Sequence, residues 1–218
     1  MKRLIILLHL INITTLTILS QTESTHYLLP DFADGTVIMK NGTKNQALLN
    51  YNMVTEEMVF YQGEQILALA APTLINLDTV VIGDRKFILN DKNKFVELIH
   101  NNVYKLYVEH NCRVLPPGKP AGYGGTSQTS SVDTYSSIQS GGMWYKLEVP
   151  DNFEIKPFKT YWIDDGSGSK EIRSMRQLRR FFSKNRESYN SYMKDNKVEF
   201  DDYESVKGLV DFIEMNSN

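Results

Sequence analysis

The sequence predicts a mainly β domain, antiparallel and built as a meander, sandwich or open barrel, with a small C-terminal helical unit, α+β overall. Three observations carry this prediction. Asn41-Gly42 lies between two apolar runs, which is the strongest short-range signal of a β-hairpin. Apolar and polar residues then alternate in successive runs up to about residue 172. A helical period begins only near Ser174, so the strands precede the helices.

The runs at 95–100 and 103–110 predict a further hairpin. Asn101-Asn102 fits a two-residue turn between them, which would place His100 opposite Val103. A helix over 94–100 is the competing interpretation, because Phe95, Leu98 and Ile99 also fit one helical face. The runs at 143–149 and 158–165 predict two more strands, the second ending in the turn Asp165-Gly166-Ser167-Gly168.

The C-terminal unit is predicted as three helices. Ser174 and Gln177 have the spacing of a capping box at the start of the first helix. The second helix is expected near residues 186–194. Asp201 or Asp202 caps the last helix. Its apolar stripe recurs at helical spacing and consists of Val206, Leu209, Val210 and Ile213.

The chain opens with Lys2, Arg3 and an apolar run, followed by small or polar residues, which is the plan of a secretory signal peptide over residues 1–20 cleaved after Ser20. The run is shorter than the ~20 apolar residues of a spanning helix, so no transmembrane helix is expected in the mature form. The sequence therefore predicts an exported protein in the periplasm, associated with the outer membrane, or extracellular.

The mature chain is expected to form a β-rich domain at 21–172 and a helical unit at 173–218 packed on the same domain. The Gly/Ser-rich stretch at 116–142 is predicted as a long loop within the β domain, because the alternating residue pattern of a strand resumes after it. Cleavage leaves 22 basic and 26 acidic groups, a net charge of −4, and nothing in this balance indicates nucleic acid.

No cofactor or metal is predicted. His110 and Cys112 would share one face of a strand, but a tight turn after His100 would keep that histidine from a shared metal site. Neighbouring carboxylates on a strand point to opposite faces, so an acid/base pair could come only from distant segments. The sequence contains no complete dinucleotide-binding, P-loop or GxSxG motif.

Two sets of residues are candidates for binding. Residues 170–186 contain seven basic residues and only one acidic residue, Glu171. Of these basic residues, Arg176, Arg179 and Arg180 could bind lipid phosphates or an acidic polysaccharide. The alternative is that this basic helix lies beside the acidic one or is simply solvated.

The second set is aromatic. Trp144, with Tyr161 and Trp162, could form a stacking platform for a sugar or an anchor for a partner protein, or could pack beneath the helices.

Several phrases, among them "FADGTVIMKNG", "VVIGDRKFI" and "SMRQLRRFFSKNRESYNSYM", resemble exported β-rich proteins of unknown function from Bacteroidetes-type bacteria. The resemblance implies a Gram-negative exported protein and carries over no functional residue. The expected function is non-enzymatic binding of a partner protein or a cell-envelope component. A secreted hydrolase acting on glycans, with a site assembled from distant residues, is the alternative.

Overall fold

The computed structural model describes residues 26–115, 119–120, 126–127 and 154–216. Ten strands form one antiparallel sheet in the order β12-β11-β8-β7-β6-β5-β1-β2-β3-β4, and β9 and β10 form a separate two-stranded pair. The strands are β1 (Ala33–Met39), β2 (Lys44–Asn52), β3 (Glu57–Gln62), β4 (Gln65–Ala68), β5 (Leu77–Ile82), β6 (Arg85–Leu89), β7 (Phe95–Asn101), β8 (Lys105–Leu115), β9 (Lys119–Pro120), β10 (Thr126–Ser127), β11 (Glu154–Asp164) and β12 (Ser169–Ile172). The predicted antiparallel, mainly β architecture is confirmed.

The turns follow the predicted chemistry with one exception. Gly42 adopts φ 84° in the β1–β2 turn, where only a residue that tolerates the left-handed region fits. The β7–β8 hairpin is also confirmed against the helical alternative, but its predicted two-residue turn is wrong. His100 pairs with Leu106, and the register shifts between Leu98 and His100. The last pair, Asn101 with Lys105, leaves a turn of three residues, 102–104, and the irregularity places His100 on the same face as Leu106.

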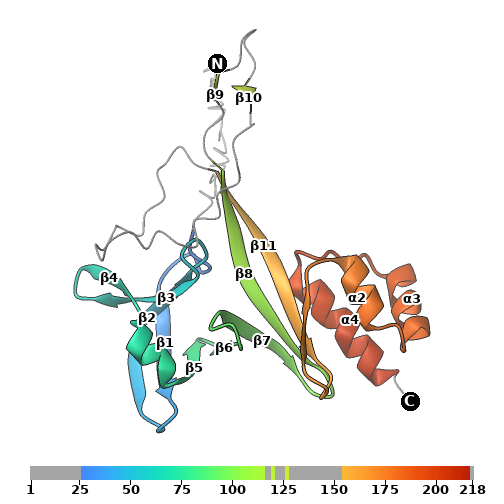
Figure 1. Cartoon of the computed structure of the whole chain (residues 1–218), viewed down its shortest axis with the longest axis horizontal. Helices are drawn as coiled ribbons and strands as arrows, with labels where there is room; N and C mark the ends of the chain where they lie inside the picture. Colours follow the sequence, from blue (N-terminus) through green and yellow to red (C-terminus); the bar gives the residue numbers. More distant parts are fainter. Residues whose placement is uncertain (1–25, 116–118, 121–125, 128–153, 217–218) are drawn as a thin grey trace, which may run out of the picture.

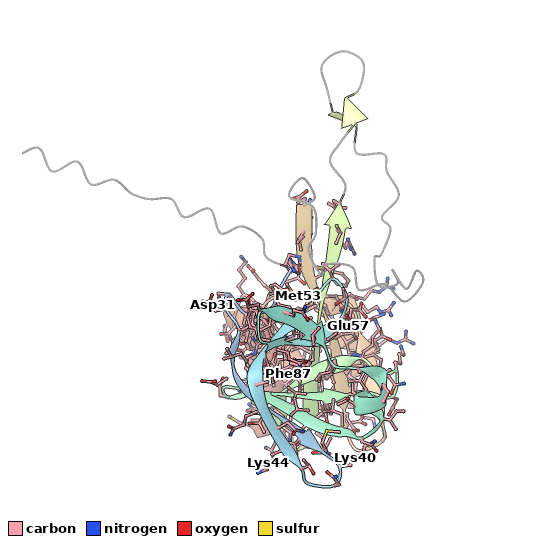
Figure 2. The ribbon with its side chains drawn as sticks, turned by 90° about the vertical axis from the view of Figure 1, so that its left-hand side faces the viewer. Asp31, Lys40, Lys44, Met53, Glu57 and Phe87 are labelled. Carbon is pink, nitrogen blue, oxygen red and sulfur yellow. The ribbon has the colours of Figure 1, made fainter. Side chains whose placement is uncertain are left out.

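The sheet curls strongly in its N-terminal half. Strands β2 and β7 are separated in the sheet by β1, β5 and β6, which in a flat sheet would place them about 19 Å apart. Tyr51 on β2 and Phe95 on β7 nevertheless have ring centroids 6.2 Å apart. Figure 2 shows Phe87 near the middle of this half, with Met53 and Glu57 at one end and Lys44 at the other. The curl therefore lets one sheet enclose its own core.

One row of directly paired residues crosses seven strands on the inner face of the sheet. All seven side chains are buried, and six are apolar or aromatic. The row consists of Val37, Val80, Phe87, Glu97, Val108, Tyr161 and Ile172. Glu97 is the one charged member, and it separates the core of the N-terminal half from that of the C-terminal half.

Three helices cover the C-terminal half of the sheet beside β8 and β11 (Figure 1). They are α2 (Met175–Phe181), α3 (Arg186–Asp195) and α4 (Tyr203–Met215), and Asp202 caps α4 by accepting the Glu204 N–H. The predicted stripe of α4 is confirmed, since its four members are buried. A further short helix, α1 (Ala71–Ile75), was not predicted. No helix in the described part of the chain is long and apolar enough to span a membrane.

The predicted leader at 1–20, most of the loop at 116–142 and the strand at 143–149 lie outside the described residues. The two strands that flank this stretch, β8 and β11, are direct neighbours in the sheet and pair through eleven residue pairs. The chain therefore leaves the sheet at Leu115 and returns beside the same strand.

Candidate functional site

The basic face of the molecule is built by α2 and the start of α3. Ser174 Oγ accepts the N–H of Gln177 (3.3 Å), and Gln177 Oε1 accepts the N–H of Arg173 (2.6 Å), so side-chain bonds fix the beginning of α2. Leu178 and Phe182 are buried in the core. At helical spacing, the arginines between them must point to solvent.

Five exposed cations form this face, which we call the basic face: Arg176, Arg179, Arg180, Lys184 and Arg186. None of the five forms an ion pair with another residue in the described ranges. On α4, Asp211 instead pairs with Lys207 and His100, and Glu214 pairs with His100. The two oppositely charged helices therefore do not neutralise each other.

The charge of the chain is strongly segregated. Residues 170–186 hold seven basic groups and one acidic group, a net charge of +6. The rest of the chain then has 17 basic and 25 acidic groups, a net charge of −8, which restores the total of −2. Arg179 and Arg180 lie in the last turn of α2, where cations complement the helix dipole. That effect does not account for the other three.

The flank of the basic face is neutralised. Glu171 on β12 pairs with Lys92 (2.8 Å) and with Arg173 (2.5 Å), and the Lys92 ammonium lies 4.7 Å from the Trp162 ring centroid. Lys170 lies over the ring of Phe181 at 5.4 Å. These cations are already engaged, so the unpaired positive charge of residues 170–186 lies on the five residues of the basic face.

The predicted aromatic platform is not assembled in the described residues. Tyr161 is fully buried, and its hydroxyl donates to the carbonyl of Phe200 (2.7 Å). Trp162 is 9% exposed, and its Nε1 donates to Glu109 (3.0 Å). Both rings therefore pack within the domain, while Trp144 lies outside the described residues.

A buried ionic cluster, which the sequence did not indicate, lies on the inner face of the sheet. Arg85 donates from Nε and Nη2 to the two carboxylate oxygens of Glu97, both at 2.7 Å. His110 Nε2 lies 2.6 Å from Glu97 Oε2, and since a carboxylate only accepts, that nitrogen is the donor. The local signal was a single glutamate, Glu97, on the apolar face of the run at 95–100.

The pKa values of this cluster are set by competition between burial and pairing. Burial alone would raise the pKa of Glu97, but its hydrogen bonds with Arg85 and His110 outweigh burial and lower the pKa from 4.5 to about 2. Burial lowers the pKa of His110 below its ordinary value of 6.5. The carboxylate is therefore permanently charged near neutral pH and fully partnered, which is the chemistry of an internal ion pair.

Cys112 is not a reactive thiol. Burial, with a smaller contribution from Glu56, raises its pKa to about 11, so the thiol is protonated near neutral pH. Nearby, Lys94 bridges Glu56 (2.8 Å) and Glu109 (3.2 Å). Within the residues described, no three His, Cys, Asp or Glu side chains are arranged to hold a metal ion.

A small pocket of about 190 Å³ lies between the β7–β8 hairpin and α4. His100 Nδ1 is 2.8 Å from Asp211 Oδ1, and Glu214 accepts the N–H of Tyr104 (2.5 Å) and the amide of Asn102 (3.1 Å). The carboxylates that line the pocket are thus occupied in fastening α4 to the hairpin.

No family model, curated protein or solved structure matches the chain. Among the surfaces described, the basic face is the one that groups five exposed cations without an ion pair.

Proposed function

We propose that the protein is an exported, non-enzymatic binding protein that attaches through its basic face to an anionic component of the cell envelope. The single observation that carries the proposal is the set of five exposed cations without ion-pair partners in the described structure, on a chain whose remainder is acidic. Such segregation steers a molecule so that one side meets a negative surface and the other side is repelled from it.

Two further features support this proposal. The ionisable groups inside the sheet, such as Glu97 and Glu109, are buried and already paired, so they offer no open acid/base site. The opening of the sequence has the plan of a secretory leader, which would deliver the protein to the envelope.

Charge reversal tests the proposal. Each basic residue near an anionic surface contributes about 1 kcal/mol, so Arg176→Glu/Arg179→Glu/Arg180→Glu should weaken binding to phosphatidylglycerol-containing vesicles about a hundredfold or more. The measurement is vesicle co-sedimentation at several salt concentrations, and the wild-type affinity should fall as salt screens the charges.

The matched control reverses three exposed lysines outside the basic face: Lys40→Glu/Lys44→Glu/Lys86→Glu. Both variants change the net charge by the same amount. The control should lose less than about threefold, because its sites lie in the β1–β2 turn, on β2 and on β6, across β8 and β11 from the helices (Figure 1). Equal losses in the two variants would show that only the total charge matters, and the basic face would not be the binding surface.

A further inference from the structure

We infer that the basic face recognises phosphate groups, specifically those of an anionic lipid headgroup layer, through the guanidinium groups of Arg176, Arg179 and Arg180. This inference rests on the proposed function and adds the chemical class of the partner. It is carried by the kind of cation on the face, by the freedom of the three guanidinium groups from carboxylate partners, and by the absence of an exposed ring among the aromatic residues described there.

The cations are segregated by type as well as by sign. Residues 173–186 contain five of the eight arginines of the chain but only one of its sixteen lysines, Lys184. Charge and solubility alone would be served equally well by lysine. Arginine differs because its planar guanidinium donates two parallel hydrogen bonds to one phosphate or carboxylate, whereas an ammonium acts as a point charge. The composition therefore favours recognition of an oxyanion over simple attraction.

The guanidinium groups are free to form such bonds. Elsewhere in the described structure, Arg85 and Arg173 already bind carboxylates, and Arg113 lies over the Phe158 ring at 5.1 Å. Arg176, Arg179 and Arg180 have no recorded carboxylate partner in the described ranges, and they are neighbours at spacings of three and four residues on one helix. The basic face thus exposes three guanidinium groups to solvent on one short helix.

The surroundings favour a lipid layer over an acidic polysaccharide. The arginines are exposed on α2, and Figure 1 shows α2 and α3 in the helical cover that lies outside β11. Sugar chains are commonly held against exposed aromatic rings. The aromatic residues of α2 and α3 are buried or half-buried instead: Phe181, Phe182, Tyr189 and Tyr192. A layer of lipid phosphates attracts a polybasic surface without needing such rings.

The decisive variant keeps the charge but replaces the three guanidinium groups by ammonium groups: Arg176→Lys/Arg179→Lys/Arg180→Lys. It should bind phosphatidylglycerol-containing vesicles about tenfold more weakly than the wild type, because lysine cannot form the bidentate bond. Inorganic pyrophosphate should displace the wild type from the same vesicles. Wild-type binding to polygalacturonate, a carboxylate polysaccharide, should be weaker than binding to the vesicles. Circular dichroism and urea midpoints should match the wild type, since all three side chains are exposed.

The outcomes separate the two proposals. If the lysine variant binds the vesicles as tightly as the wild type while the glutamate variant does not, recognition of phosphate is wrong and electrostatic binding stands. If the wild type prefers polygalacturonate, the partner is a polysaccharide and the inference fails. If the glutamate variant also keeps full affinity, the proposed function itself is wrong.

Discussion

The two halves of the sheet cover their cores in different ways. In the N-terminal half the sheet curls until Tyr51 and Phe95 meet, so the strands enclose most of the core, and Leu74 of the short helix α1 packs against it. In the C-terminal half the sheet is more extended, and α2, α3 and α4 cover its inner face with residues such as Leu178 and Leu209. The same face of one sheet therefore supports two kinds of core.

This difference explains where the basic face lies. A strand with one buried face presents every second side chain to solvent, whereas a surface helix exposes more than half of its residues. On α2, Leu178 packs inward while Arg176, Arg179 and Arg180 remain exposed on a segment of only seven residues. The helical cover thus concentrates charge in a way that the curled half of the sheet does not.

The largest effect is expected where the halves meet, at Glu97. Glu97→Ala would leave the partly buried guanidinium of Arg85 and the buried imidazole of His110 without their shared carboxylate. Removal of one partner from a buried ion pair costs about 3–5 kcal/mol, and urea unfolding followed by circular dichroism would measure the loss.

The double variant Arg85→Met/Glu97→Met provides the control. Replacing both charges with apolar side chains should recover most of the lost stability, because no charge is then left unpaired. A double variant as unstable as Glu97→Ala would show that packing around Glu97, and not its pairing, accounts for the cost.

A smaller loss, shared by both halves, is expected from core truncation. Leu209 on α4 and Leu49 on β2 are both completely buried. Leu209→Ala and Leu49→Ala should each reduce the free energy of unfolding by about 2–4 kcal/mol. The row of paired residues that crosses seven strands predicts that the two variants shift a single transition. Two separate transitions in either variant would mean that the halves unfold independently.

Local chemistry made most of the fold predictable. The Asn41-Gly42 turn, the Ser174 cap and the stripe Val206 to Ile213 each depend on residues close together in sequence, and each is confirmed. The irregularity before His100 was missed because it depends on how β7 meets β8. The curl was missed for the same reason, since Tyr51 and Phe95 are distant in sequence.

The candidate site was only partly predictable. The basic residues were visible as a charge run, but whether α4 neutralised them depended on tertiary contacts that no spacing reveals. Tyr161 and Trp162 illustrate the opposite case. Their aromatic type suggested a platform, yet Tyr161 is buried under the helices and Trp162 on the opposite face of β11, each with an internal hydrogen-bond partner. Exposure is decided by the fold, and composition alone does not report it.

The smallest expected effect is a pH dependence of the free energy of unfolding, and it comes from the ionic cluster where the two halves meet. The folded pKa of His110 lies below its ordinary value of 6.5, so the unfolded chain binds that proton first, and stability should decline as pH falls below about 6.5. The folded pKa of Glu97, about 2 against 4.5, adds a second decline in stability as pH falls through 4.5.

Urea midpoints measured between pH 7.5 and 5, in steps of about half a unit, would isolate the first decline. His110→Gln keeps a donor for Glu97 but cannot titrate, so its midpoint should fall less over this range. An equal fall in both proteins would exclude His110 as the source and leave the boundary insensitive to pH near neutrality.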